Sequence, residues 1–557
     1  MKRKTIAAVL AISMAAALLG GCGGTGETGS AASETNAKGT EQGAAESKGS
    51  EAGSSDSKDT EDGASNSSDT KDAESESEET KTAGSDDIVK LKWYMSINPV
   101  APDTDKVIEK LNEYTRDKIG VEIDYQVIAN PDYKEKMPTY INSGEYFDIC
   151  FTANWTTNYA QFATRDAFMD ITELLPQYAK ETYDFIPQEE WDAVKVDGKI
   201  YGVPSYKEMG WQGSIYANSD MAKEYGIDLS KVKTLNDYTE VLKTVKEKSQ
   251  AEGKNVIGLS GLNSGFQLGV PFESLTGTPT LPGASAIPET NLFADQEEVF
   301  NQYATPEYME YCKMIHGWYQ NGYISKDPVQ YDSDIANRDN DFNNGNLFSY
   351  VTANAPGAAQ MLETTAGHGI TAIDLTMPIF ETRSALGGLL AISSGSEHPE
   401  KALEFINLLN TDQYVGTLIR HGIEGEHYTA VGDNQIDRTM GGTLSPDKNG
   451  YDYTFGWQFG TPFNQKWDIS YPENIVELFE EYNGKSITAK HNGFMVDTTT
   501  VETVIASVTN VVAQYGPALE SGMVDPEEKI PEFLKQLEEN GVDELLNEIS
   551  SQIKDQK

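Results

Sequence analysis

Alternating apolar and polar residues predict two strands near the beginning of the foldable part of the chain. Residues 88–95 place apolar side chains from Val89 to Met95 on one face, and residues 121–127 alternate in the same way. Between them, apolar residues recur at helical spacing from about Thr104 to Lys118, and Gly120 follows as a C-terminal cap. The pattern therefore predicts a strand-helix-strand unit.

The pattern continues with a second helix and a third strand. Residues from about Tyr133 to Ile141 have helical spacing, and the apolar run Phe147–Phe151 follows them. Alternating strands and helices imply a mostly parallel sheet covered by helices, and ligands bind such sheets at the carboxyl ends of the strands. The loop after this strand is at such an end, and it displays Asn154 and Trp155.

Three more helices are predicted near the C-terminus. Apolar residues follow helical spacing over residues 501–515, 530–537 and 545–549. Each segment forms an apolar stripe of the kind that packs against a core. We therefore expect these helices to be structural.

The first 22 residues have the layout of an export signal. A basic head, Lys2-Arg3-Lys4, precedes an apolar run of about 15 residues, which is short for a bilayer span of about 20. The run ends at Leu19-Gly-Gly-Cys22, which resembles the bacterial lipobox, where the cysteine is diacylated and becomes the first residue of the mature protein. We predict a lipoprotein signal peptide over residues 1–21 and a lipid anchor on Cys22. The alternative is cleavage of a signal peptide without lipidation, which would leave Cys22 as an unmodified thiol with no role in anchoring.

Residues 22–87 differ in composition from the rest of the chain. From Gly23 onward they contain no Val, Ile, Leu, Met, Phe, Tyr or Trp and carry a net charge of about −12, so they cannot form a core. A flexible chain of about 65 residues spans about 45 Å on average. We predict a disordered acidic tether that lifts a domain off the membrane. Such a tether suits a Gram-positive surface, although Gram-negative lipoproteins can carry tethers too.

Composition argues against nucleic-acid binding and against a fold held together by disulfides. The chain has 557 residues, of which 88 are acidic and 43 basic, for a net charge of −45. A protein that grips phosphates needs clustered Lys and Arg, so we expect no nucleic acid as a partner. The length allows two or three domains. Only three cysteines occur, which excludes a disulfide framework, and Cys150 and Cys312 are expected to be buried free thiols.

Five segments resemble a known family in their order and spacing. They are Gly198–Pro204, Ser214–Met221, the capped helix Thr234–Leu242, Leu386–Ser394 and His398–Leu409. This series resembles the family 1 extracellular solute-binding proteins, which are the sugar-capturing subunits of carbohydrate ABC importers. The segment Gly416–Tyr428 and the tail from Gly493 onward are similar to a lipoprotein subgroup of that family with a helical C-terminal extension.

The resemblance implies an α/β fold of the two-lobed, type II periplasmic-binding-protein kind. Each lobe would be a mostly parallel sheet flanked by helices, and two or three hinge crossings would join the lobes. Lobe 1 would hold about residues 88–204 and 385–490, and lobe 2 about residues 214–381 and 495–557. The sugar would bind between the lobes, which would close over it.

The candidate ligand-binding residues follow from the chemistry of a neutral sugar and from the resemblance. A sugar offers apolar ring faces and hydroxyl groups, so its site needs flat aromatic side chains and amide or carboxylate partners. The candidates are Asn154, Trp155, Glu208, Trp211, Phe266, Asn354 and Trp457. Each aromatic could instead pack its loop onto a lobe, and Glu208 could instead pair with Lys207. The other four tryptophans are expected in the core: Trp93, Trp191, Trp318 and Trp467.

The motifs of catalysis and metal binding are incomplete. Gly484-Lys-Ser resembles the end of a P-loop, but Phe479 stands where a glycine is required, and neither a Gly-x-Ser-x-Gly elbow nor a His-Glu-x-x-His motif occurs. One set of residues could gather around zinc by type, although the resemblance implies a structural turn there: His421, Glu424, Glu426 and His427. A run from Asp339 lacks the glycine and glutamate of a calcium loop. We expect no cofactor and no metal at these motifs, and calcium elsewhere stays open.

The sequence therefore predicts a lipid-anchored solute-binding protein rather than an enzyme. It would act as a monomer on the outer face of the cell membrane, capture an oligosaccharide and deliver it to an ABC permease driven by a separate ATPase. Alternatives keep the fold but bind a peptide, a polyol or another small solute. A surface glycoside hydrolase with two carboxylates and a sugar-sensing or adhesion protein are further alternatives.

Overall fold

The computed structural model describes residues 88–97, 100–262, 280–282, 290–293, 300–442, 449–453, 456–489, 492–497 and 499–555. All of these residues belong to one compact unit. The predicted signal peptide, Cys22, the tether and Phe266 lie outside the described residues, so those expectations stay predictions. Within the described part of the chain, no helix combines the length and apolar character that a bilayer crossing requires.

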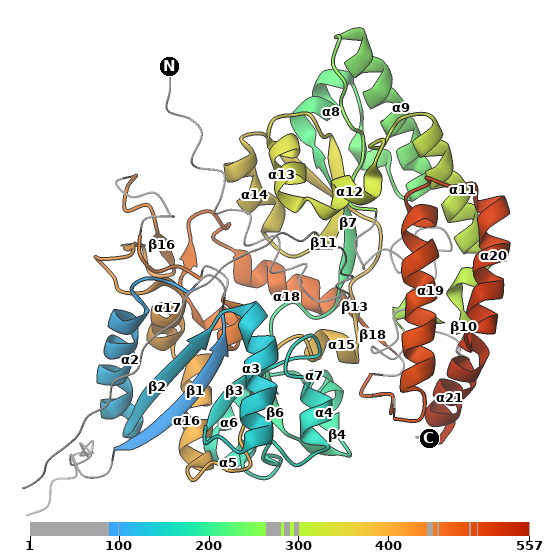
Figure 1. The fold of residues 1–557 in the computed structure, drawn as a ribbon. Coiled ribbons are helices and arrows are strands. Elements are labelled where there is room, and N and C mark those ends of the chain that lie inside the picture. The colour runs from blue at the N-terminus through green and yellow to red at the C-terminus, as the bar shows by residue number, and fades with distance from the viewer. Residues whose placement is uncertain are drawn as a thin grey trace, which may run out of the picture. The chain divides into compact units, whose positions relative to one another are not determined.

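The first sheet has five strands in the order β2-β1-β3-β14-β6 (Figure 1). Its strands are β1 (Val89–Ser96), β2 (Val121–Ile128), β3 (Ile149–Thr152), β6 (Gly202–Pro204) and β14 (Leu389–Ile392). β1 pairs in parallel with β2 and β3, whereas β14 pairs antiparallel with β3 and β6. The predicted strand-helix-strand unit at the start of the fold is confirmed.

The helices of this first region form where the pattern predicts them. α2 (Thr104–Ile119) ends at Gly120, whose φ of 67° is the left-handed conformation that glycine adopts without strain. α3 (Asn130–Ser143) buries Tyr133 and Met137 on the sheet. The smaller elements that follow are α4 (Tyr159–Ala163), α5 (Leu175–Tyr178), α6 (Lys180–Phe185), α7 (Gln188–Ala193), β4 (Lys195–Val196) and β5 (Lys199–Ile200).

The second sheet has three strands in the order β11-β7-β12. They are β7 (Gln212–Asn218), β11 (Ser349–Asn354) and β12 (Ile370–Asp374). Between them in the chain lie α8 (Ser219–Tyr225), α9 (Leu235–Ala251), α11 (Pro306–Gln320), α12 (Pro328–Ser333), α13 (Ile335–Asn343) and α14 (Ala358–Ala366). α9 starts with a complete capping box between Thr234 and Asp237, so the predicted capped helix is confirmed.

The expectation of a mostly parallel sheet is wrong for this second sheet. β7 lies in its centre and pairs antiparallel with both neighbours. The reason is where β7 enters, because the chain arrives directly from β6 of the first sheet. A strand that begins at the edge where its neighbours end must run in the opposite direction to them. β14 is reversed in the first sheet for the same reason.

Three chain segments run side by side between the two sheets. The first is 205–211, the second contains β13 (Ile379–Phe380) and α15 (Thr382–Ala385), and the third contains β18 (Ile487–Thr488). Trp211 and Ile379 exchange two backbone hydrogen bonds of 2.9 and 3.0 Å, and β13 pairs in parallel with β18. We call these segments the crossing ribbon.

Two large clusters of buried hydrophobic side chains form the cores. The first core holds the first sheet together with α16 (Pro399–Thr411) and α17 (Gln413–His421), and it includes Trp93 and Trp191. The second core holds β7, α9 and α11 and includes Trp318, whereas Trp467 packs in a smaller cluster. All four tryptophans are buried, as predicted, and Cys150 and Cys312 are buried free thiols. The exact bounds of the two lobes stay predictions.

The C-terminal helices complete the second core. They are α19 (Glu502–Glu520), α20 (Pro526–Glu539) and α21 (Val542–Asp555), and Figure 1 shows them beside α11. Val508, Phe533 and Leu545 from the three helices are fully buried in this core. The prediction that these helices are structural is therefore supported by their packing.

Candidate ligand-binding site

The register of the first sheet brings three distant loops to one edge. Leu389, the first residue of β14, lies opposite both Thr152 at the end of β3 and Pro204 at the end of β6. The loops that follow β3 and β6 and the loop that precedes β14 therefore meet. They carry Trp155, Lys207 and the Gly387–Gly388 pair, and such an edge is where open α/β sheets bind ligands.

Trp155 and Trp457 form an aromatic pair at this edge. Their ring centroids are 6.4 Å apart with an interplanar angle of 65°, and Phe151 lies 5.9 Å from each ring. The Trp155 indole Nε1 donates a hydrogen bond of 2.8 Å to the Gly387 carbonyl. Trp155 is half-buried, which leaves part of its ring available for a ligand.

Trp457 is held more firmly than Trp155. It begins a single 3-10 turn between Gly456 and Gly460, and only 9% of its surface is exposed. Its carbonyl accepts a hydrogen bond of 2.5 Å from the Ser205 hydroxyl. A Cβ on Gly388 would come within 2.5 Å of the Trp457 ring, so only glycine fits beneath it. Packing is thus a clear role of Trp457, and its role as a sugar platform stays a prediction.

Charged and amide groups surround the aromatic pair. The Lys207 ammonium lies 5.8 Å from the Trp457 ring centroid and forms an ion pair with Glu208. Within the described part of the chain, the buried Glu208 Oε2 has no hydrogen-bond partner. The Asn154 Nδ2 group donates to the Arg383 carbonyl at 3.2 Å. Asn154, Trp155, Glu208 and Trp457 therefore form one group, which we call the first-edge cluster, with Lys207 added.

A second cluster lies at the corresponding edge of the second sheet. Asn354 ends β11 opposite Gln212, the first residue of β7, and Trp211 precedes it. Asn354 is the last residue of β11 rather than a residue after the strand, because pairing with β7 continues to its end. Its Nδ2 donates to Asp374 at 2.9 Å and its Oδ1 accepts from the Tyr216 hydroxyl at 2.8 Å. Asn354 is thus engaged within the protein, and the exposed Asp374 carboxylate beside it is the more accessible group.

Helix α18 (Ile475–Lys485) ties the second cluster to the crossing ribbon. The Tyr482 hydroxyl approaches the Gly210 carbonyl at 3.3 Å and the Asn354 carbonyl at 3.5 Å. Asn483 accepts from the Met209 backbone N–H at 2.7 Å and donates to the Lys207 carbonyl at 2.9 Å. The first crossing is therefore fixed on both sides of Glu208.

The sequence analysis did not identify three residues of this region as candidates for the site. Lys207 entered only as a partner of Glu208, and Asp374 and Tyr482 were not considered. Asp374 could have been found, because it is the last residue of the strand 370–374. Its position at the carboxyl end of a strand is similar to that of Asn154, which follows a different strand. Nothing in the local pattern of α18 marks Tyr482, because its role depends on a contact with β11.

Glu190 on α7 is a buried acid next to the first-edge cluster. Burial raises the pKa of its carboxyl from 4.5 to about 8, although the charge of Lys207 opposes the shift. The folded protein therefore keeps a proton on Glu190 between about pH 4.5 and 8, where the unfolded chain releases it. Glu190 consequently makes the folded state less stable as the pH rises through this window.

Replacing Glu190 with Gln should flatten the pH dependence of stability. The wild-type free energy of unfolding should fall with pH by up to about 1.4 kcal/mol per unit more than that of Glu190→Gln between pH 5 and 8. Urea unfolding at four pH values measures both slopes. Glu189→Gln, on the exposed face of the same helix, serves as the control and should keep the wild-type slope. Equal slopes for wild type and Glu190→Gln would contradict the assignment.

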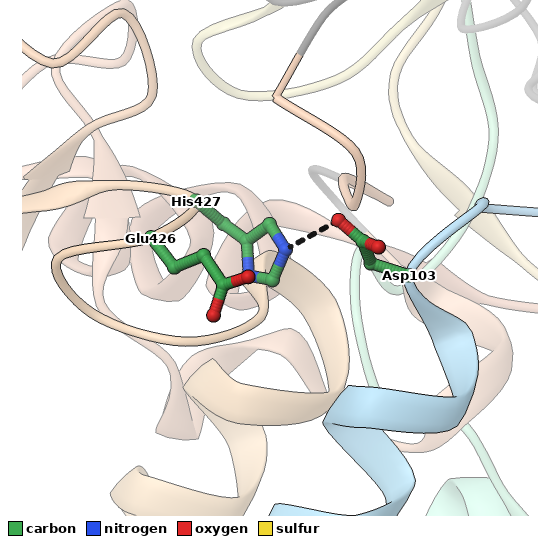
Figure 2. Close-up of side chains that lie close together, drawn as sticks. All are labelled: Asp103, Glu426 and His427. Carbon is green, nitrogen blue, oxygen red and sulfur yellow. Dashed lines mark hydrogen bonds and ion pairs between the residues drawn. The ribbon is translucent and has the colours of Figure 1, made fainter.

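The residues with metal-ligand chemistry at the 421–427 turn do not gather as one set of four. Asp103, Glu426 and His427 lie within 4.8 Å of one another by their ligand atoms (Figure 2), whereas the His421 Nε2 contacts Gln465. His427 Nδ1 accepts the backbone N–H of Ile423 at 2.8 Å, so the proton of the neutral ring is on Nε2, which faces Asp103. A metal at Nε2 would have to remove that proton as well.

Lys106 supplies the positive charge that a metal would otherwise bring to these carboxylates. Its ammonium lies 2.6 Å from Glu426 Oε1 and 3.3 Å from Asp103 Oδ1. The group is therefore a hydrogen-bonded ion cluster that joins α2 to the 422–428 turn.

Comparison with known proteins links this geometry to a family. The model of the family described as bacterial extracellular solute-binding protein matches residues 106–420, and a domain of unknown function matches residues 490–556. A carbohydrate ABC transporter substrate-binding protein of Streptococcus pneumoniae is 28% identical over 479 residues, which cover 84% of this chain and 91% of that protein. Lipoprotein LipO of Bacillus subtilis is 23% identical over 368 residues, which cover 62% and 68%.

Solved structures share the fold. The crystal structure of the N-glycan transport solute binding protein from Streptococcus pneumoniae superimposes with a TM-score of 0.72 at 24% identity, covering 84% of this chain and 98% of that one. The same protein in complex with Man5GlcNAc gives a TM-score of 0.60 at 25% identity, covering 84% and 97%. The expected two-lobed, type II fold is confirmed by these neighbours.

Proposed function

The chain belongs to the bacterial extracellular solute-binding proteins, and we propose that it captures an oligosaccharide outside the cell and delivers it to the permease of an ABC importer. The observation that carries the proposal is the first-edge cluster. There, the half-buried Trp155 ring pairs with Trp457. The Lys207 ammonium near the Trp457 ring pairs with Glu208, whose buried Oε2 can accept a hydroxyl, as a sugar site requires. The relatives named as carbohydrate transporter components and the Man5GlcNAc complex support a glycan as the ligand.

Binding would proceed by closure of the two lobes. Trp155 and Trp457 belong to one lobe in this proposal, and Trp211, Asn354 and Asp374 belong to the other. A glycan that contacts both groups stabilises the closed arrangement, because only there are all contacts made at once. The crossing ribbon would be the hinge, and the permease would recognise the closed form.

The protein acts as a binding protein and not as an enzyme in this proposal. The family is one of binding proteins, and transport energy would come from a separate ATPase. The signal peptide and Cys22 would anchor a monomer to the outer face of the cell membrane through lipid, with the tether as a spacer. The relative named as a lipoprotein supports this location.

A thermal-shift screen of the full chain tests the proposal. Ligand that binds only the folded state raises the melting temperature. Oligosaccharides of plant and host origin should raise it, with amino acids, short peptides and polyols as comparison ligands. If no sugar raised the melting temperature but peptides or polyols did, the fold assignment would stand and the ligand would not be a carbohydrate. Release of reducing sugar from an oligosaccharide would instead indicate a hydrolase.

Trp155→Ala should weaken glycan binding by roughly 1–3 kcal/mol, the scale of burying a large side chain. The fold should survive, because the Trp155 ring is half-buried in a loop and packs against the surface of the first core rather than within it. Titration calorimetry measures the affinity and circular dichroism the fold. Tyr414→Ala, which removes a 47% exposed aromatic on α17, is the control and should bind normally. Unchanged affinity in Trp155→Ala would remove this residue from the site.

A further inference from the structure

We propose that the first-edge cluster selects uncharged glycans and rejects glycans that carry a carboxylate, with the Lys207–Glu208 pair as the selecting element. This inference rests on the proposed function and narrows its ligand class. It depends on how the charges around Trp155 and Trp457 are already paired within the protein.

Both cations at this cluster have a carboxylate partner. Lys207 pairs with Glu208, and the two side chains are only 20% and 11% exposed. Arg383, whose carbonyl binds Asn154, has its Nε 3.1 Å from Glu381 Oε1, and these side chains are 23% and 6% exposed. A ligand carboxylate that enters the cluster would therefore meet cations that already have carboxyl partners within the protein.

The remaining acceptor capacity favours hydroxyl donors. Glu208 Oε2 is buried and, among the described residues, has no hydrogen-bond partner, so a sugar hydroxyl can donate to it while the ion pair stays intact. The carboxyl of Glu190 also interacts electrostatically with Lys207 and Glu208. A carboxylate on the ligand would thus compete with the Glu208 carboxylate for the one Lys207 ammonium group.

The cost of such competition is large because the groups are shielded from water. Burying a carboxylate is unfavourable unless a cation pairs with it. Interactions between charges at a few ångströms are several times stronger near a protein than in bulk water. We expect a neutral glycan to bind at least about tenfold more tightly than the same glycan with one carboxylate near the cluster.

The experiment begins with the full chain on a glycan array that holds neutral glycans, Man5GlcNAc among them, beside their sialylated and uronate counterparts. A neutral glycan that binds, with its acidic counterpart at least about tenfold weaker by calorimetry, is the expected result. Equal binding of the two would overturn the inference and leave the proposed function intact. An array with no bound glycan would overturn the proposed function itself.

Two variants then change the discrimination in opposite directions. Glu208→Gln keeps an acceptor but frees the Lys207 charge, so the neutral-to-acidic affinity ratio should fall toward one. Lys207→Met removes the cation, so the ratio should rise. Glu480→Gln, which removes an exposed acid on α18, is the matched control and should leave the ratio unchanged. Variants that weaken neutral and acidic glycans by the same factor would show a merely structural role and overturn the inference.

Discussion

Ending the chain at residue 489 is expected to unfold the second core rather than to remove a separate domain. The residues of this core that would be lost are Phe494, Val501, Val508, Val511, Leu519, Ile530, Phe533, Leu537, Val542, Leu545, Ile549 and Ile553. Each buried large apolar side chain stabilises a fold by about 1.5–3 kcal/mol. Their combined loss exceeds the total stability of about 5–15 kcal/mol that a domain has.

Circular dichroism, hydrogen exchange and thermal unfolding measure this effect. The shortened chain should lose exchange protection in β7, α9 and α11, and it should no longer bind glycan. A chain that ends at Ile553 keeps every residue of the second core and is the control, which should unfold at the wild-type temperature. If the chain ending at 489 unfolded cooperatively at the wild-type temperature, the C-terminal helices would be an appended domain. The match to a domain of unknown function would then need a different role.

Gly210→Ala is expected to destabilise the protein by about 3 kcal/mol and to disturb the crossing ribbon. Gly210 has a φ of +91°, and a Cβ there would lie 2.7 Å from the Ile379 carbonyl carbon and 2.8 Å from the Phe380 nitrogen. Both atoms belong to the backbone, so no side-chain rotation can relieve the contact. Relief requires the two segments of the crossing ribbon that contain Gly210 and Ile379 to separate. That separation breaks the two backbone hydrogen bonds between Trp211 and Ile379.

A second glycine separates this contact from backbone strain alone. Gly226, the C-terminal cap of α8, has a φ of +72°, and a Cβ at this position would have no atom within 4 Å. Gly226→Ala should therefore cost only about 1 kcal/mol, the penalty of the left-handed conformation. Urea unfolding of both variants measures the difference. Equal destabilisation would mean that the close approach of the first and second crossings adds nothing to the strain of the left-handed conformation.

Local patterns in the sequence determined most of the elements near the beginning and the end of the fold. The first strand-helix-strand unit was predictable because alternation and helical spacing are read within a few residues. Gly120 and Thr234 mark a helix end and a helix start by chemistry that acts within one turn. The C-terminal helices were predictable for the same reason, and burial of the four core tryptophans followed from their place in such elements.

The composition of the candidate cluster could be predicted only in part. Asn154 and Trp155 are candidates because they follow a strand, and Trp457 is a candidate as an aromatic residue suited to a sugar ring. The sequence did not show that Trp457 is nearly buried beneath Lys207, nor that Gly388 leaves room for its ring. It also did not show that Asn354 ends β11, because the end of that strand is set by its pairing with β7. Asp374 and Tyr482 emerged only from contacts between elements.

The sequence by itself thus determined the helices, the first strands and the residue types suited to a sugar, because each depends on neighbours along the chain. The tertiary structure decided which loops meet, the direction of β7 and the pairing of charges. The bond between Ser205 and Trp457 joins residues that are 252 positions apart. Such a contact forms only when Thr152, Pro204 and Leu389 align at one edge of the sheet, and local periodicity carries no information about that alignment.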